Sequence, residues 1–351
     1  MKVLEKSESN KNQIQLDLKD KKILKLLSIN ARFSLSRISK YVRLTRDAVK
    51  YRINRLEKNN VITGYLTLIN LKKLGFSSYH IFTELHPNIE KESEMIMFFK
   101  ENKNINAVLK YSGKLDYELA LVVREFEELD HVFTSIINKY PIKNYEILIL
   151  LKIIKSSTFP EALLDETIRI ESGKNDGSFF KNFMKTKNKS LKVDKNDINI
   201  LELISNNARI PMVDISKKLN MSQDSVSYKI KNMIENTIIL EFRPAINYSI
   251  LGYYVYTVLL SLQNLDNKNE EEFKNFLKNN KNVLWAVKTI GRWNFLVYVI
   301  TKNEEEFHKV INQIRLEFPD IIRTYETLLA NEEYKYTYFP EIIKERQYDK
   351  E

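Results

Sequence analysis

Residues 16–75 read LDLKDKKILKLLSINARFSLSRISKYVRLTRDAVKYRINRLEKNNVITGYLTLINLKKLG, and many of these residues return 177 positions later in the same chain. The run Asn30-Ala31-Arg32, for example, recurs as Asn207-Ala208-Arg209. Later matches keep the same order with small slips, as when Gly113 recurs as Gly291 at a shift of 178. Slips of this size fall in presumptive loops, where added residues cost little. The 351-residue chain is therefore predicted to contain two copies of one two-domain unit.

The composition is that of a globular protein, with 43% hydrophobic and 29% charged residues. No apolar run approaches the roughly 20 residues that span a bilayer, so no membrane partner is expected. The chain has no cysteine, which excludes disulfides and thiolate chemistry and predicts a cytoplasmic location. None of the four histidines (His80, His86, His131, His308) is paired at a metal-ligand spacing, so no metal or cofactor is predicted. A net charge of +10 suits a polyanionic partner, although a solvated basic surface is the alternative.

The first domain of each copy is predicted to be a winged helix-turn-helix, over residues 16–64 and 193–241. Apolar residues recur at helical spacing in three short segments of the first copy, and Thr45 is a good N-cap for the third. Only a few residues separate the second and third segments, which is typical of a helix-turn-helix. The alternating run over residues 61–68 is expected to form the wing or hairpin.

The outward face of the third helix carries the predicted DNA-binding residues of the first copy. Residues 43–58 contain six basic and two acidic side chains, and Arg, Asn and Lys can bond base edges or phosphates. The predicted set is Arg43, Thr45, Arg46, Lys50, Tyr51, Arg52, Asn54 and Arg55. Within it, Arg46, Lys50 and Asn54 would face bases, whereas Arg43, Arg52 and Arg55 would contact phosphates. The alternative is a solvated helix with local ion pairs.

The second copy is predicted to bind DNA with lower affinity. Residues 220–235 contain two basic and two acidic side chains, so the phosphate contribution to affinity is weaker. Its predicted DNA-binding residues are Ser222, Gln223, Ser227, Tyr228 and Lys231. The alternative is a unit that serves mainly as a packing partner. Arg32 and Arg209 are expected to form an ion pair within each helical unit, with a phosphate contact as the alternative.

The second domain of each copy is predicted to be a ferredoxin-like β-α-β-β-α-β sandwich, over residues 65–160 and 242–342. Alternating strands, helical segments and turns follow one another in that order in both copies. The fold class is therefore α+β, duplicated. The polar, basic residues 161–192 read as a linker between the copies. The aromatic side chains of Tyr334, Tyr336, Tyr338 and Phe339 are expected to pack in a sheet or an interface.

Residues 16–75, with Gly64-Tyr65 at the start of the strand, resemble the DNA-binding half and linking strand of the Lrp/AsnC (feast/famine) transcription regulators. The resemblance covers nearly the whole chain, twice. It implies a sequence-specific regulator that binds double-stranded DNA. It also implies an intrachain pseudo-dimer that could associate into homo-oligomers. In the second copy Glu241-Phe242 replaces Gly-Tyr, which leaves the pairing of that strand open.

The same resemblance implies an amino-acid effector near a Gly-x-x-Asp turn between subunits. Gly113 and Asp116 match this turn, and Gly291 and Asn294 match it with Asn for Asp. The alternative is an ordinary β-turn, which favours the same residues.

Two other functions stay open. Some proteins of this architecture resemble sirohaem decarboxylases, which place a histidine shortly before an aromatic-Asn pair. Trp293-Asn294 resembles that pair, but Trp285 and, in the first copy, Ala107 occupy the histidine position, so neither a catalytic residue nor an enzyme is predicted. The third possibility is a scaffold that does not bind DNA and controls related regulators through mixed assemblies.

Overall fold

A computed structural model describes residues 4, 13–86, 91–163, 193–264 and 266–345. The predicted linker, residues 161–192, lies outside these residues except for its first three and the 3-10 turn η2 (Glu161–Leu163) that they form. Within the described ranges, no helix has both the length and the apolar character that crossing a membrane requires.

Each copy begins with three short helices that form the predicted helix-turn-helix. In the first copy they are α1 (Leu18–Ile29), α2 (Leu35–Val42) and α3 (Arg46–Lys58). In the second they are α7 (Lys195–Asn206), α8 (Met212–Leu219) and α9 (Gln223–Glu235). Asp17 caps α1 and Thr45 caps α3, each side chain accepting a hydrogen bond from a free backbone N–H of the first turn.

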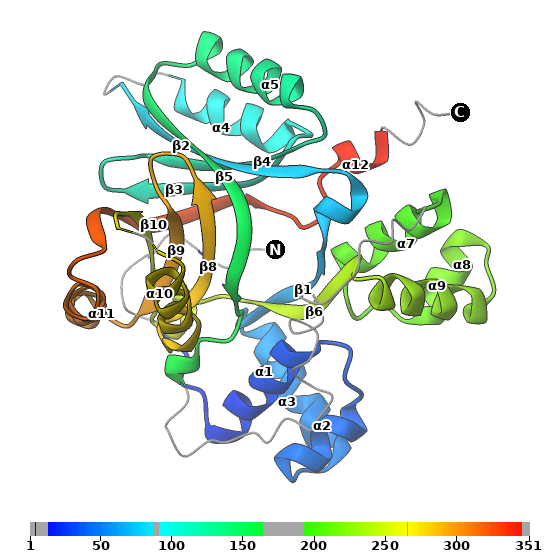
Figure 1. Cartoon of the computed structure of the whole chain (residues 1–351). Helices are drawn as coiled ribbons and strands as arrows, with labels where there is room; N and C mark the ends of the chain where they lie inside the picture. Colours follow the sequence, from blue (N-terminus) through cyan, green and yellow to red (C-terminus); the bar gives the residue numbers. More distant parts are fainter. Residues whose placement is uncertain (1–3, 5–12, 87–90, 164–192, 265, 346–351) are drawn as a thin grey trace.

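The strand after each helix-turn-helix pairs with its counterpart in the other copy. Strand β1 (Ile62–Ile69), the predicted wing strand, lies antiparallel to β6 (Ile239–Ile246), so it pairs with the other copy and not in a hairpin of its own. Glu241 and Phe242 take part in this ladder, which settles the open question about their strand. The two helical units flank the ladder, as Figure 1 shows. Short 3-10 turns, η1 (Leu71–Leu74) and η3 (Ser249–Leu251), then lead out of it.

Both ferredoxin-like domains have the predicted β-α-β-β-α-β order. The first contains β2 (Ser77–Leu85), α4 (Glu92–Glu101), β3 (Ile105–Ser112), β4 (Tyr117–Val123), α5 (Phe126–Lys139) and β5 (Ile142–Ser156). The second contains β7 (Tyr254–Leu262), α10 (Asn267–Asn279), β8 (Val283–Ile290), β9 (Phe295–Thr301), α11 (Glu304–Glu317) and β10 (Ile322–Tyr336). A short helix, α12 (Ile342–Glu345), follows.

The two four-stranded sheets join into one closed barrel of order β10-β3-β4-β2-β5-β8-β9-β7. Strand β5 leaves its own sheet to pair with β8, and β10 pairs with β3 in the same way. The last strand of each copy is therefore longer than the sequence indicated, because its end is stabilised by a strand of the other copy. Closure leaves the barrel strands without open edges, so any further association of chains has to use other faces.

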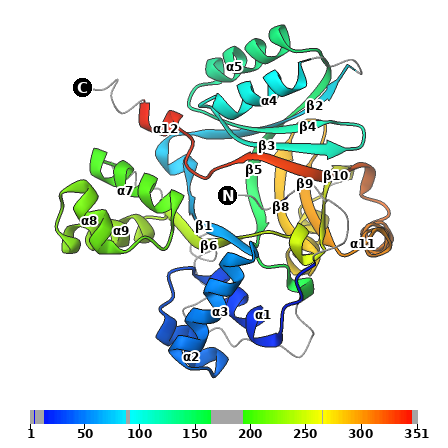
Figure 2. The ribbon, with the colours of Figure 1, turned by 180° about the vertical axis from the view of Figure 1, so that it is seen from behind.

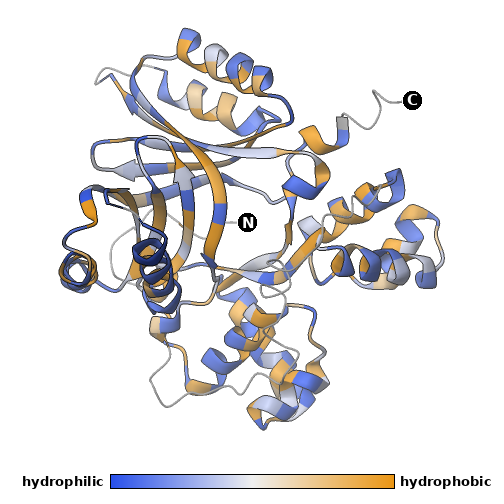
Figure 3. Ribbon diagram, viewed as in Figure 1, coloured by the Kyte–Doolittle hydropathy of each residue, from blue (hydrophilic) through white to orange (hydrophobic). Residues whose placement is uncertain are grey.

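Alternate residues of each strand face opposite sides of the barrel wall. On β4, Tyr117, Leu119 and Leu121 pack under α4 and α5, whereas Ala120 and Val122 belong to the central core. Helices α10 and α11 cover the second sheet in the same manner. Figure 2 shows α4, α5 and α11 outside the strands, and Figure 3 shows that much of β5 is hydrophobic, with hydrophilic residues interrupting it. The barrel is thus the shared core of an intrachain pseudo-dimer.

Candidate functional site

Helix α3 presents a polar face to solvent at the end of the first helix-turn-helix. Val49, Ile53 and Leu56 are buried, which turns the intervening side chains outward. The exposed residues of the predicted set are Arg43, Thr45, Arg46, Lys50, Tyr51 and Asn54. Tyr51 is 68% exposed, a large aromatic side chain held out in water. A face of this composition is suited to insertion into a DNA groove.

The backbone before α3 fixes how this face is presented. Arg43 has a left-handed conformation with φ of 53°, which ends α2, and Thr45 Oγ1 then accepts a hydrogen bond from Ala48 N–H at 3.2 Å. Asn220, with φ of 51°, and Ser222 repeat the arrangement before α9. Both copies therefore keep the tight turn that a helix-turn-helix needs.

The guanidinium groups of Arg52 and Arg55 both bind carboxylates of α1, a contact that the sequence did not predict. Arg52 Nη1 lies 2.6 Å from Asp17 and 2.8 Å from Asp20, and Arg55 Nη2 lies 2.5 Å from Asp20. Asp20 is only 1% exposed and a buried carboxylate requires cationic partners. Arg52 and Arg55 thus hold α3 against α1, and their assignment as phosphate contacts stays a prediction. The acidic partners lie more than thirty residues away along the chain, which is why helical spacing alone missed them.

Helix α9 repeats this architecture with a weaker charge. Ser222, Gln223, Ser227, Tyr228 and Lys231 are all exposed, Tyr228 at 71%. Lys231 Nζ lies 3.8 Å from the Glu235 carboxylate on the same helix, and this negative charge partly offsets the positive charge of Lys231. Lys229 occupies the place of Arg52 and contacts Asp194 at 2.6 Å and Asp197 at 3.0 Å. The ion pairs of Arg52 are therefore kept, whereas that of Arg55 is lost because Asn232 takes its place, and the surplus of basic side chains on the outer face is lost as well.

Arg32 and Arg209 connect the two helical units and, among the residues that the structure describes, form no ion pair within their own unit, so that expectation was wrong. Arg32 donates to the carbonyl oxygens of Ala208 at 2.7 Å and Ile210 at 3.2 Å, and Arg209 donates to that of Ala31 at 2.5 Å. Each guanidinium also lies over an aromatic ring of the β1–β6 ladder, Arg32 over Phe242 and Arg209 over Tyr65. Burial, together with the charge of Arg209, lowers the pKa of Arg32. These reciprocal contacts are called the arginine interlock below.

The predicted effector turns lie where one copy meets the other, but their functional atoms are engaged. Asp116 Oδ2 accepts a hydrogen bond from Leu85 N–H at 2.7 Å, and Asn294 Oδ1 accepts one from Leu262 N–H at 2.6 Å. A Cβ at Gly113 would lie 2.8 Å from the Leu328 side chain, and one at Gly291 would lie 2.8 Å from Ile147 O. These glycines permit close approach of β10 and β5. The geometry therefore supports the β-turn alternative for all four residues.

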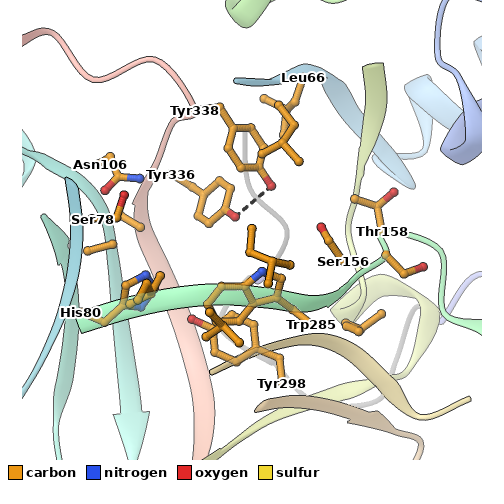
Figure 4. Close-up of a pocket in the computed structure, with 18 of the residues that line it drawn as sticks. Leu66, Ser78, His80, Asn106, Ser156, Thr158, Trp285, Tyr298, Tyr336 and Tyr338 are labelled. Atoms are coloured by element: carbon orange, nitrogen blue, oxygen red, sulfur yellow. Dashed lines mark hydrogen bonds between the residues drawn. The ribbon is translucent and has the colours of Figure 1, made fainter. Parts of the chain in front are cut away.

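A cavity of about 440 Å³ lies inside the pseudo-dimer, between the barrel and the β1–β6 ladder. Aliphatic side chains from both copies line it, together with aromatic and polar groups that Figure 4 shows: His80, Trp285, Tyr298, Tyr336 and Tyr338. Trp285 stacks on His80 with ring centroids 5.7 Å apart, and Tyr298 packs against Trp285 at 5.0 Å. Tyr336 and Tyr338 thus pack at an interface, as predicted for that aromatic cluster, and Phe339 is buried beside them.

A buried polar network closes one side of this cavity. The fully buried carboxyl group of Glu118 accepts hydrogen bonds from His80, Tyr111 and Tyr298, the last at 2.6 Å. Burial and the charge of Glu118 raise the pKa of Tyr111 well above its usual value, so this phenol stays protonated. His80 comes from β2 and stands beside Trp285 of β8, so a histidine from another strand lies next to the residue that occupies the histidine position in the sequence. Among the described residues, no three acidic, histidine or cysteine side chains gather as metal ligands.

Two protein-family models match the helical units. The AsnC-type helix-turn-helix domain matches residues 16–57, and a winged helix-turn-helix DNA-binding model matches residues 193–239. In addition, the chain is 29% identical over 153 residues to the HTH-type transcriptional regulator LrpB of Bacillus subtilis, covering 44% of this chain and all of LrpB. It is 32% identical over 124 residues to LrpA of Pyrococcus horikoshii, covering 35% of this chain and 87% of LrpA.

Among solved structures, the crystal structure of the sirohaem decarboxylase NirDL is similar over 95% of this chain and 97% of its own, with a TM-score of 0.63. The identity is 14%, so this likeness concerns the fold, a duplicated arrangement of the same two domains. The relatives with clear sequence identity each match less than half of the chain, as expected where two units are fused. The chain therefore belongs to the Lrp/AsnC family of transcription regulators and consists of two such units in one polypeptide.

Proposed function

We propose that this protein is a sequence-specific DNA-binding transcription regulator that acts in the cytoplasm, and that it is not an enzyme. The observation that carries the proposal is the exposed face of α3, where Arg46, Lys50 and Asn54 project from a capped helix after a tight turn. Arginine and lysine can bond guanine edges, asparagine can bond adenine, and Tyr51 can pack against the sugar-phosphate backbone. The regulators LrpB and LrpA, to which the chain is similar, support the same function.

The two recognition helices are proposed to contribute unequally. Helix α9 offers Gln223 and Lys231 in place of Arg46 and Asn54, and Lys231 lies near Glu235. The phosphate contribution to affinity depends on the number of cations that reach the backbone. We therefore propose that α3 supplies most of the affinity, α9 supplies less, and the operator is asymmetric. Footprints that show an even palindrome would contradict the asymmetry.

The test is binding of the purified chain to fragments of genomic DNA, including the region upstream of its own gene, across a salt series. Arg46→Ala combined with Lys50→Ala should abolish preference for the enriched fragments and lower the salt slope by roughly 0.9 per lost phosphate contact. Gln223→Ala with Lys231→Ala should weaken binding less. Lys309→Ala with Arg315→Ala, on α11, is the matched control and should bind as the parent does. Unchanged affinity in the first variant would show that α3 does not recognise the DNA sequence.

A small effector, such as an amino acid, is proposed to modulate binding, and chains are proposed to associate through faces outside the closed barrel. The side-chain oxygens of the Gly-x-x-Asp turns already accept backbone hydrogen bonds. An effector that binds these oxygens would have to displace the backbone hydrogen bonds. Equilibrium dialysis with free amino acids, followed by sedimentation with and without the ligand that binds, tests both statements.

One observation favours a second candidate, a tetrapyrrole enzyme like the sirohaem decarboxylases. His80 faces Trp285 in the central cavity of a chain that has the fold of NirDL. Absence of specific DNA binding, together with saturable binding of an iron porphyrin and loss of that binding in His80→Ala, would replace the regulator proposal with this one. If neither DNA nor porphyrin binds, the remaining hypothesis is a scaffold that controls related regulators. The balanced charge of α9 is the feature that favours this hypothesis.

A further inference from the structure

The central cavity has the size of a binding site for an organic molecule. Its volume of about 440 Å³ falls in the range of roughly 300–1,000 Å³ that is typical of ligand pockets. A dry cavity of about 150 Å³ accepts benzene, so the present one offers room for about two or three aromatic rings. It is clearly separate from the Gly-x-x-Asp turns, none of whose residues lines it.

The walls of the cavity favour a flat aromatic body. The ring of Trp285 is stacked on His80 at one side, and Tyr336 and Tyr338 lie at another, as Figure 4 shows. Between them the lining is aliphatic, from Leu66, Leu109 and other side chains. Aromatic faces and aliphatic walls together bind ring systems through area burial and offset stacking.

The charge of the lining favours an anion. Three of its residues are cationic (Lys72, Lys152 and Arg243) and one is acidic (Glu333). Arg243 is 4% exposed, donates to Ser156 Oγ at 2.8 Å and to the Tyr338 hydroxyl, and lies 3.6 Å from Glu241. Its Nε–H nonetheless lacks a hydrogen-bond acceptor in the part of the chain that the structure describes. A buried guanidinium N–H of this kind is suited to a carboxylate oxygen.

The indole of Trp285 and the buried guanidinium of Arg243 are present on one side of the pseudo-twofold axis alone. The counterpart of Trp285 in the other copy is Ala107, and the counterpart of Arg243 is Leu66. Two identical subunits could not build such a cavity, because each would supply the same residues. Fusion of the copies has therefore permitted a site in which Trp285 and Arg243 on one side face Ala107 and Leu66 at the equivalent positions of the other.

We propose that this cavity is a binding site for a single aromatic carboxylate of two or three rings. The ring system lies between Trp285 and the tyrosine pair, with Ala107 leaving the space, and the carboxylate bonds Arg243. Arg243 belongs to β6, which carries the second helical unit. Any effect of the ligand on DNA affinity rests on the proposed function, whereas binding itself does not.

The test uses 2-naphthoate as the probe and Trp285 as the reporter. The chain has two tryptophans, so Trp293→Phe leaves Trp285 as the sole source of tryptophan emission. Titration with 2-naphthoate should change that emission saturably, at one molecule per chain. The neutral analogue 2-naphthalenemethanol should bind roughly ten- to a hundredfold more weakly, since it cannot form the charge-assisted bond. This comparison needs no further variant and is independent of DNA.

Two substitutions in the Trp293→Phe background locate the site. Arg243→Met should remove the preference for the carboxylate, and Ala107→Phe should block both probes by filling the cavity. Arg323→Met, an exposed position at the far end of β10, is the matched control and should bind as the parent does. Circular dichroism verifies that each variant is folded.

Three outcomes would overturn the proposal: no saturable change with 2-naphthoate, equal affinity for the alcohol, or full binding by Ala107→Phe. Saturable binding of uroporphyrin without binding of 2-naphthoate would also overturn it, in favour of the enzyme candidate. If the chain binds 2-naphthoate but recognises no specific DNA, the site is upheld while the proposed function fails.

Discussion

Replacement of Arg32 by methionine is expected to destabilise the protein by about 2–3 kcal/mol. Arg32 forms two hydrogen bonds to carbonyl oxygens of the other copy, at 2.7 and 3.2 Å. Hydrogen bonds from a charged group are worth about 1.5–3 kcal/mol each, and the longer one contributes less. The ring contact with Phe242 adds roughly 0.5 kcal/mol. Methionine keeps the apolar stem and avoids burying a cation, which recovers part of this loss.

The reciprocal residue gives a second value and a coupling. Arg209→Met removes the hydrogen bond to the Ala31 carbonyl oxygen at 2.5 Å and should cost about 1–2 kcal/mol. Because the positive charge of Arg209 disfavours the charged form of Arg32, removal of one guanidinium relieves repulsion on the other. Each single loss is reduced by relief of the same repulsion, so the double variant should lose more than the two single losses combined.

The assay is urea unfolding followed by far-UV circular dichroism, with free energies from linear extrapolation. Arg37→Met is the control, since Arg37 lies over the Phe33 ring of its own unit at 4.0 Å and should cost about 0.5 kcal/mol. A loss for Arg32→Met no larger than that of the control would refute the reasoning. It would mean that the arginine interlock contributes nothing to the union of the two helical units.

Three further outcomes are expected. Gly291→Ala should destabilise the protein by at least about 2 kcal/mol, because its Cβ would meet a backbone oxygen at 2.8 Å. Gly75→Ala, with open space around it, should cost about 1 kcal/mol. Thermal unfolding that shows the larger loss for Gly75→Ala would contradict this reasoning. Glu118→Leu should cost about 2–4 kcal/mol by the same assay, since three buried donors lose their acceptor, and a neutral result would mean that the network is dispensable. The hydrogen bond from Lys110 lowers the pKa of Glu92, so its stabilisation is present above the unfolded-state pKa and is lost as pH falls through the lowered value. Glu92→Gln should therefore flatten the acid limb of stability against pH, and an unchanged limb would exclude this group as a cause.

Most secondary structure and the outward face of α3 could be predicted from the sequence, because both depend on local periodicity. Val49, Ile53 and Leu56 are spaced to face one core, and this spacing alone turns Arg46 and Lys50 outward. The partners of Arg52 and Arg55 could not be found in this way, since Asp20 lies on another helix.

The contacts between the copies could likewise not be predicted from local periodicity. The aromatic residues near the end of the stretch from Ala330 to Tyr336 indicated packing in a sheet or an interface, but periodicity could not identify the partner strand, which is β3 of the other copy. The pairing of β1 with β6 and the position of His80 in the cavity are also consequences of distant segments meeting. One signal was available: the duplication itself, which indicates that each copy has a counterpart with which to pair.

Closure of the barrel within one chain has a genetic consequence. In a regulator assembled from separate identical subunits, a damaged subunit enters mixed dimers and disables intact ones. Here β5–β8 and β10–β3 pair strands of the same polypeptide, so a chain with a defective α3 has no barrel strand to offer to an intact chain. Loss-of-function alleles of this gene are therefore expected to be recessive rather than dominant-negative at the level of the barrel. In a cell that also makes single-unit relatives, the same closure insulates this regulator from subunit exchange.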